Sequence, residues 1–303
     1  MQLLSTHGNG RVAVVRTGLT SRGSRVEFVE SLQPPRPIED KWVLIISTLK
    51  GCPVKCPICD AGGSYAGRLT ADELLEQIDC MVTARYPDRV VPCRQFKIQF
   101  SRVGDPAFNP GVLEALRALP RSFNAPGLMP SISTIAPKGS EAFLEQLAPI
   151  KDKLYPNGAF QMQFSLHTSC EDARRTLVPW PTLPIDYLAD WGRRFHKTGD
   201  RRITLNFAAV RGYPIDPAVL AGRFSPDHFM VKLTPVNPTA ASRNAGLVGV
   251  VDPDNPADGD ALAAAFAAQG FETLVSIGEL EENQIGSNCG MYLATYTPDE
   301  KCS

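Results

Sequence analysis

The sequence lacks any long apolar segment and any clear excess of one charge. Its 303 residues contain no run of about 18 consecutive apolar residues, so no membrane-spanning helix is predicted. The 31 basic residues nearly balance the 32 acidic ones, whereas nucleic-acid-binding proteins usually carry a basic excess or stripe. The first ten residues show no basic stretch followed by an apolar core, so we expect no secretory signal and a cytoplasmic protein.

Disulfide bonds are not expected either. In a cytoplasmic protein, cysteines serve as metal ligands, reactive thiols or core residues more often than as disulfide partners. The chain has eight cysteines, and three of them crowd into the short segment 52–59. This crowding is more informative than the total count. The other five are scattered along the chain: Cys80, Cys93, Cys170, Cys289 and Cys302.

Strand-like and helix-like segments alternate along most of the chain. Short alternating runs within residues 11–30 suggest a small hairpin, and the prolines of 34–37 separate it from the rest of the chain. The predicted strands are 42–48, 95–101, 128–134, 159–166, 202–210, 228–234 and 271–277. The predicted helices are 70–84, 111–118, 140–147, 185–196 and 258–269. About six β/α units predict a parallel sheet with outer helices, as a full or partial barrel.

Three cysteines follow the first predicted strand of this repeat with the spacing C-x3-C-x2-C: Cys52, Cys56 and Cys59. A cubane iron–sulfur cluster usually takes four cysteine ligands, so three local thiolates would leave one iron open to a ligand from outside the protein. A structural zinc site is the alternative, but it usually pairs two cysteine arms and closes four ligands. Cys80 and Cys93 are isolated and form no second arm. The spacing therefore favours a [4Fe–4S] cluster.

This motif resembles that of the radical S-adenosylmethionine (radical SAM) enzymes, in which the amino and carboxylate groups of SAM bind the open iron. The tripeptide Gly104-Asp105-Pro106 follows the second strand of the repeat. It resembles a SAM-binding element of one branch, the radical SAM ribosomal-RNA adenine methyltransferases. The resemblance implies that Gly104 and Asp105 hold the SAM amino group. Elsewhere in a chain, the same tripeptide would be an ordinary turn.

Four more segments are similar to this branch, in the same order. Ser133 lies in a segment that resembles its third-strand SAM contact. Ser165 and His167 belong to a Ser-Leu-His that resembles the end of its fourth strand. Asn237 resembles the asparagine that contacts SAM after the sixth strand, and Cys289 resembles the cysteine that carries the methyl group. Taken singly, each would be an ordinary strand-end, turn or packing residue. The matches extend from about residue 25 to 293.

The chain also departs from this branch. The branch resolves its methylated intermediate with a second cysteine, and the corresponding position here is Ile45. Cys80, Cys93 or Cys170 could substitute, although none lies in a matching motif. The accessory domain that helps the branch to engage RNA is not expected, because only 51 residues precede Cys52. The fold can therefore be shared while the RNA methylation reaction is not.

We predict an α/β fold, a partial (β/α)6 TIM-like barrel of the radical SAM type. A hairpin is expected over residues 1–38, the barrel over 39–240, and a C-terminal extension over 241–303. Two residues are candidates for catalysis. Cys289 would be a methyl carrier or a hydrogen-atom donor, with a packing role as the alternative. Glu27 aligns weakly with a glutamate proposed as a base in the branch.

The predicted function is reductive cleavage of SAM and radical modification of a substrate. An external electron donor such as a flavodoxin or ferredoxin is the expected partner. The expected substrate is a small metabolite, a peptide or a nucleic acid; the missing thiol disfavours ribosomal RNA without eliminating it. Two alternatives stay open. One is an RNA adenine methyltransferase with a relocated resolving thiol, and the other is a non-catalytic iron–sulfur or zinc-binding module.

Overall fold

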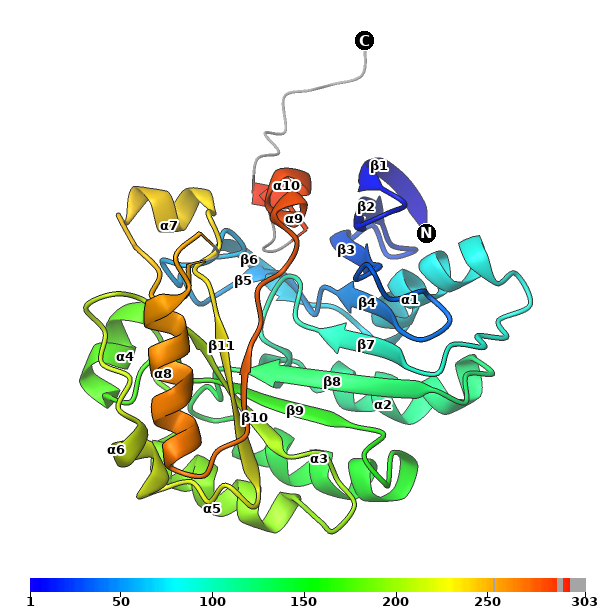
Figure 1. The fold of residues 1–303 in the computed structure, drawn as a ribbon. Helices are drawn as coiled ribbons and strands as arrows, with labels where there is room; N and C mark the ends of the chain where they lie inside the picture. Colours follow the sequence, from blue (N-terminus) through cyan, green and yellow to red (C-terminus); the bar gives the residue numbers. More distant parts are fainter. Residues whose placement is uncertain (253, 288–290, 295–303) are drawn as a thin grey trace.

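A ten-stranded sheet forms the centre of the protein (Figure 1). The computed structural model describes residues 1–252, 254–287 and 291–294. The strand order is β1-β2-β3-β4-β7-β8-β9-β10-β11-β12, and β5 with β6 forms a separate two-stranded sheet. Pairing is antiparallel from β1 to β4 and parallel from β4 to β12.

The parallel strands are short and mostly buried, as continuous apolar runs between turns predict. Their bounds are β4 (Trp42–Ile46), β7 (Phe96–Phe100), β8 (Leu128–Thr134), β9 (Gln161–Ser165), β10 (Ile203–Ala208), β11 (Phe229–Thr234) and β12 (Thr273–Val275). Each lies inside the range that the sequence predicted. The parallel sheet with outer helices is therefore confirmed.

The N-terminal segment forms three antiparallel strands: β1 (Gln2–Asn9), β2 (Ala13–Leu19) and β3 (Arg25–Ser31). The hairpin expected within residues 11–30 corresponds to β2 and β3 and is confirmed. β1 is not predicted by the sequence, because most of its residues are exposed and show no apolar alternation.

Five helices correspond to the predicted ones: α1 (Ala71–Arg85), α2 (Gly111–Ser122), α3 (Glu141–Leu154), α5 (Ile185–Phe195) and α8 (Ala257–Ala268). The shorter helices were not predicted, because too few residues repeat to give a periodic apolar signal. These are η1 (Pro106–Phe108), α4 (Glu171–Leu177), α6 (Pro217–Ala221), α7 (Ala240–Asn244), α9 (Leu280–Ile285) and α10 (Met291–Ala294). Among the described helices, none is both long and apolar enough to cross a membrane.

A capping box starts α1, the helix that covers β3 and β4. The Thr70 hydroxyl accepts a hydrogen bond from the Glu73 amide at 3.3 Å, and the Glu73 carboxylate accepts one from the Thr70 amide at 2.8 Å. These two bonds satisfy backbone donors that the first helical turn leaves free. Glu73 also accepts from the Thr20 hydroxyl at 2.8 Å, so the same residue ties the helix to the N-terminal strands.

The sheet curves but does not close. In the part of the chain that the structure describes, β1 and β12 are the two ends of the sheet and do not pair with each other. This arrangement confirms a partial barrel. The antiparallel strands continue the same sheet, because Val29 of β3 pairs with Ile45 of β4. The division of the chain at residues 38 and 240 stays a prediction.

Candidate functional site

The predicted SAM contacts that the structure describes lie at one rim of the sheet. Parallel strands have their carboxyl ends on the same side, which is where α/β barrels place their active sites. The ends of four parallel strands carry or precede these residues. They are Gly104 after β7, Ser133 near the end of β8, Ser165 and His167 at and after the end of β9, and Asn237 after β11.

The cysteine motif forms a hairpin directly after β4, in β5 (Leu49–Cys52), β6 (Gly63–Arg68) and the turn between them. Cys52 ends β5, and the amide of Cys59 donates to the carbonyl of Cys56 at 3.1 Å within the turn. All three side chains belong to one apolar cluster at the rim. The structure therefore brings the three predicted ligands together.

The surroundings of these thiols fit an iron–sulfur cluster. Burial raises the pKa of Cys52 to about 11 and that of Cys56 to about 12, so their thiolates need a strong positive partner. Among the described residues, no three His, Cys, Asp or Glu side chains converge to hold a single metal ion. The ligands of a cubane need not converge, since they bind several irons. A bound metal centre deprotonates the thiols that ligate it.

Gly104 allows the loop after β7 to approach the cysteine hairpin closely. Its φ is +91°, in the left-handed region that favours glycine. A Cβ at this position would lie 2.4 Å from Cγ of Leu49 on β5. The carbonyl of Gly104 also accepts a hydrogen bond from the Thr48 hydroxyl at 3.0 Å. Any other residue at position 104 would therefore push the two loops apart.

The Asp105 carboxylate joins the ends of β7 and β8. One oxygen accepts from the Ala107 amide at 2.9 Å and from the Thr134 hydroxyl at 2.7 Å. The other accepts from the Ile135 amide at 2.7 Å. Burial raises the pKa of Asp105 to about 6, although these bonds favour the ionised form. A carboxylate has about four acceptor positions, so one remains for a ligand.

His167 is buried just after β9, and its φ of 66° is uncommon for a residue other than glycine. The amide of Ala208 donates to Nδ1 at 3.1 Å, so the proton of the neutral ring is on Nε2. Burial, and then the charge of Arg174, lowers the pKa of His167 to about 4. The ring is therefore neutral at neutral pH and can donate from Nε2.

Arg174 was missed by the sequence analysis, yet it is a buried cation at this rim. Its Nη2 donates to the carbonyl of Ile135 at 2.8 Å and to that of Ser165 at 3.2 Å. Its Nε has no hydrogen-bond partner among the described residues. Burial raises the pKa of Cys56 and Asp105, and the charge of Arg174 partly offsets this rise in both. Arg174 therefore supplies positive charge beside the cysteine hairpin.

The loop that carries Asn237 is hydrogen-bonded to the cysteine hairpin. The Asp60 carboxylate accepts from the amides of Ala240 and Ala241 at 3.0 and 2.8 Å, at the start of α7. The loop is thereby fixed to the segment that follows Cys59. Asn237 itself is half-buried and lines a cavity at the rim. These contacts bring the first and the last of the predicted SAM-site segments side by side.

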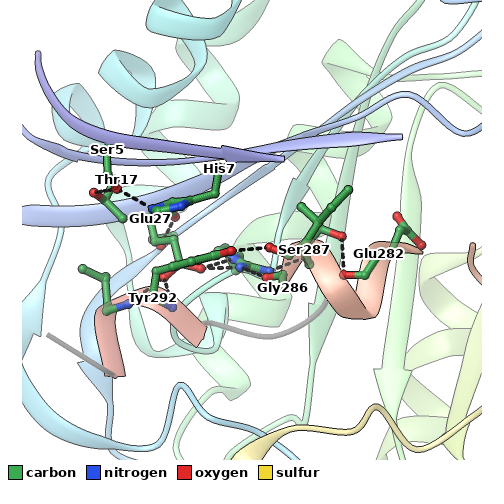
Figure 2. A network of polar contacts seen from close by, with 12 residues as sticks. Ser5, His7, Thr17, Glu27, Glu282, Gly286, Ser287 and Tyr292 are labelled. Atoms are coloured by element: carbon green, nitrogen blue, oxygen red, sulfur yellow. Dashed lines mark hydrogen bonds and ion pairs between the residues drawn. The ribbon is translucent and has the colours of Figure 1, made fainter. Parts of the chain in front are cut away.

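Glu27, the candidate base, is fully buried on β3 and paired with Arg102 (Figure 2). Arg102 donates from Nε at 2.7 Å and from Nη2 to the same carboxylate oxygen. The other oxygen accepts from the amides of Tyr292 and Leu293, at 3.1 and 2.9 Å, in α10. The carboxylate thus binds the C-terminal segment through its second oxygen while the first holds the arginine.

Arg102 holds the preceding part of the same segment. Its Nη2 donates to the carbonyl of Gly286 at 2.8 Å, and its Nη1 donates to the carbonyl of Ser287. The residues on either side of 288–290 are therefore bound to one buried ion pair, as Figure 2 shows. Cys289, the predicted methyl carrier or hydrogen-atom donor, lies outside the described residues.

Ile45, at the position of the resolving cysteine of the methyltransferase branch, lines the cavity at this rim. The other cysteines considered as substitutes lie elsewhere. Cys80 and Cys93 contact the core between the sheet and its helices, and Cys170 precedes α4. Of the described cysteines, none lines the cavity. A relocated resolving thiol therefore has no support among them.

The cavity has a volume of about 590 Å³ and fills the opening between the first and the last parallel strands. Ser101 and Asn237 line it at the rim, and residues 276–279 line it from the C-terminal segment. Its size is that of a pocket for a small molecule. The predicted SAM contact Asn237 and the cavity thus share one opening.

No family model matches the chain, but its sequence is similar to those of several RNA methyltransferases. It is 28% identical over 183 residues to a probable dual-specificity RNA methyltransferase RlmN of Thermus thermophilus. The aligned segment covers 58% of this chain and 48% of that protein. It is also 28% identical over 287 residues to a probable dual-specificity RNA methyltransferase RlmN of Streptomyces coelicolor. That aligned segment covers 90% of this chain and 71% of the relative. The chain spans about half the length of several curated relatives that it matches.

The fold is also similar to that of a solved structure. A radical SAM methyltransferase from Sphaerobacter thermophilus superposes with a TM-score of 0.72 and 21% identity, over 96% of this chain and 80% of that one. These similarities confirm the predicted resemblance to radical SAM methyltransferases and the predicted class of fold.

Proposed function

We propose that this chain, which is similar to radical SAM methyltransferases in sequence and fold, is a radical SAM enzyme. Cys52, Cys56 and Cys59 would ligate a [4Fe–4S] cluster. Such a cluster, when bound and reduced, supplies the electron that cleaves SAM to methionine and a 5′-deoxyadenosyl radical. One observation carries the proposal. The Leu49 amide on β5 donates to the Val103 carbonyl at 3.1 Å, and the Thr48 hydroxyl donates to the Gly104 carbonyl at 3.0 Å, so the cysteine hairpin is joined to the proposed SAM loop.

The proposed SAM contacts have complementary roles. Gly104 lets the backbone approach the SAM amino group, and the remaining acceptor position of Asp105 binds the ammonium by a charge-assisted hydrogen bond. Neutral His167 donates from Nε2 to an acceptor of the adenosyl group. The hydroxyls of Ser133 and Ser165, both half-buried at strand ends, complete the polar lining.

Two further residues extend this proposed site. Asn237 approaches it from the loop after β11, with an amide that can both donate and accept. Arg174 offsets the negative charge of the thiolates, because a nearby cation favours their ionised form. Its Nε, which has no partner among the described residues, can also donate to the carboxylate of SAM.

We assign Cys289 a catalytic role, as a methyl carrier or a hydrogen-atom donor. The anchoring of Gly286 and Ser287 by Arg102 supports this role, because it holds the preceding residues at the rim. A base role for Glu27 requires that the amides of Tyr292 and Leu293 first release its carboxylate. Glu27 therefore serves as an anchor whenever the C-terminal segment is in place.

The substrate we propose is not ribosomal RNA. A methyl group on Cys289 would need a second thiol for its release by the route of the RlmN branch, and Ile45 occupies that position. The alternative, an RNA methyltransferase with a relocated thiol, needs a cysteine near the cavity. An external flavodoxin or ferredoxin would supply electrons, since the cluster needs one electron for each cleavage of SAM.

The test is anaerobic reconstitution of the full-length protein, followed by iron and sulfide analysis and an assay for 5′-deoxyadenosine with SAM and a strong reductant. We expect about four irons and four sulfides per chain. A Cys52→Ala, Cys56→Ala, Cys59→Ala variant should lose both the cluster and the product. Cys80→Ala should keep both, because Cys80 lies on α1. Stoichiometric zinc without iron in the native protein would contradict the proposal.

A further inference from the structure

A lysine is buried on the interior face of the parallel sheet. Residues alternate between the two faces of a strand. Phe96, Ile98 and Phe100 of β7 belong to the core beneath the helices, so Lys97 and Gln99 point to the opposite face. Gln99 lines the cavity of about 590 Å³, and Lys97 is only 8% exposed. Lys97 therefore lies below the floor of this cavity.

Two more lysines lie nearby and line the cavity itself. Lys41, just before β4, and Lys232, on β11, both line the cavity. Lys41, Lys97 and Lys232 form what we call the lysine cluster. Burial, and then the charges of Lys232 and Lys41, lower the pKa of Lys97 well below its usual value, and Lys41 also lowers that of Lys232. Arg36 and Arg201 add positive charge beside Lys41.

The described residues leave the lysine cluster without an ion pair. None of its three members takes part in a salt bridge within the described chain. The acids that line the cavity are Glu279 and Glu282, from the C-terminal segment. Burial and the charge of Lys41 lower the pKa of Lys232 by more than the charge of Glu282 raises it. Burying like charges together is costly unless an anion compensates them.

We infer that this cavity binds the substrate through a phosphate group held by Lys41 and Lys232, with the buried Lys97 adding positive charge beneath them. Ammonium groups are compact charges that suit phosphoryl oxygens. The role as a substrate site rests on the proposed function, whereas the binding of phosphate does not. The cavity of about 590 Å³ has the size of a pocket for a small molecule. The occupant is therefore a small phosphorylated molecule.

The geometry also sets the orientation of such a molecule. Lys97 lies three residues before the end of β7, which is roughly 10 Å along a strand. A small molecule can therefore bind the lysine cluster at its phosphate end and reach the rim with its other end. The rim is where the proposed SAM contacts lie.

The test is calorimetric titration of the full-length protein with inorganic pyrophosphate, which carries phosphoryl groups and no other recognition element. The wild-type protein should bind it saturably, and Lys97→Met and Lys232→Met should each weaken binding at least tenfold. Lys153→Met, on the exposed face of α3, is the matched control and should leave the affinity unchanged. Lys97→Met should also raise the melting temperature of the ligand-free protein, because methionine removes an unpaired buried charge.

Each result decides for or against the inference. Pyrophosphate affinity that neither cavity variant changes would overturn the site. Citrate that binds as tightly as pyrophosphate would overturn the assignment to phosphate, and weaker binding of citrate supports it. A single-stranded RNA whose binding depends on Lys232 would overturn the small-molecule assignment. If Lys97→Met does not fold, half-buried Lys232 decides alone. None of these titrations needs the cluster or SAM, so their failure is distinct from a failure to cleave SAM.

Discussion

Glu27 and Arg102 form a buried ion pair that anchors the C-terminal segment through hydrogen bonds to its backbone. The Nε–Oε distance is 2.7 Å, and the two residues are 0% and 4% exposed. The pair binds backbone carbonyls through its arginine and backbone amides through its glutamate. The ion pair therefore holds the C-terminal segment by hydrogen bonds on both sides of residues 288–290.

Arg102→Met should lower the free energy of unfolding by about 3–5 kcal/mol, because it leaves the buried Glu27 carboxylate without its cation. Adding Glu27→Gln should recover part of this loss, since a neutral amide is less costly to bury. Urea unfolding measures both. Arg193→Met is the control: its ion pair with Asp190 is exposed, so the expected change is within about 0.5 kcal/mol. Equal losses in the two arginine variants would argue against a special role for the pair.

Gly104→Ala should destabilise the protein by about 1–3 kcal/mol, through backbone strain and the collision with Leu49. Gly23→Ala separates the two effects, because Gly23 has a φ of +75° but no neighbouring atom within 4 Å of the added Cβ. In a Leu49→Ala background, Gly104→Ala should cost less than in the wild-type protein but still more than Gly23→Ala, because Cγ of Leu49 is gone while its Cβ still lies 2.5 Å from the added Cβ. Thermal unfolding of the wild-type protein, the three single variants and the double variant measures these costs. A cost at Gly104 no larger than that at Gly23 would show that the close approach does not matter.

Asp105→Asn should weaken both folding and SAM binding. The amide group replaces one acceptor oxygen with a donor, so the stability loss is about 1–3 kcal/mol. Thr134→Val is the matched variant, because it removes one hydrogen bond to Asp105 and keeps the carboxylate. If the carboxylate also binds SAM, Asp105→Asn should reduce the affinity for SAM roughly tenfold or more beyond Thr134→Val. Equal affinities in calorimetry would limit Asp105 to joining the strand ends.

His167 should make the protein less stable in acid. Its pKa falls from the ordinary 6.5 to about 4 in the folded protein. The unfolded chain therefore takes up the proton first, and stability is lost as the pH falls from 6.5 to 4. The loss reaches about 3 kcal/mol at the lower end. His167→Asn should remove this part of the pH dependence, since asparagine tolerates positive φ and can accept from the Ala208 amide. Urea unfolding at several pH values checks it, and parallel pH curves for the two proteins would disprove it.

The sequence predicted the features that depend on neighbours along the chain. The helix that begins near Thr70 and the strands of the repeat follow from local patterns. The rim residues followed from a resemblance, since Gly104 and His167 have no distinctive local pattern of their own. Their positive φ values became evident only in the structure.

The sequence could not predict the two buried arginines. Arg174 and Arg175 are adjacent and identical, but only Arg174 turns inward and meets the carbonyls of distant strand ends. Arg102 likewise acquires its role from residues 184 and 185 positions away. Such partners depend on the tertiary fold, and no periodicity reports them. The surroundings of Lys97 could not be predicted for the same reason. A single lysine in an apolar strand does not indicate which groups it will face in the fold.

The bonds from Tyr292 and Leu293 to Glu27 span 265 and 266 positions. Synthesis proceeds from the N-terminus, so the cysteine hairpin and the strands emerge from the ribosome long before the residues that cover the rim. The nascent chain thus passes through a period in which the hairpin is present and the rim is open. We expect iron and sulfide to enter most easily in this period. A chain that ends at residue 279 should therefore acquire its cluster faster in reconstitution than the full-length protein, as absorbance at the cluster's charge-transfer band would report, and equal rates would refute this order of assembly.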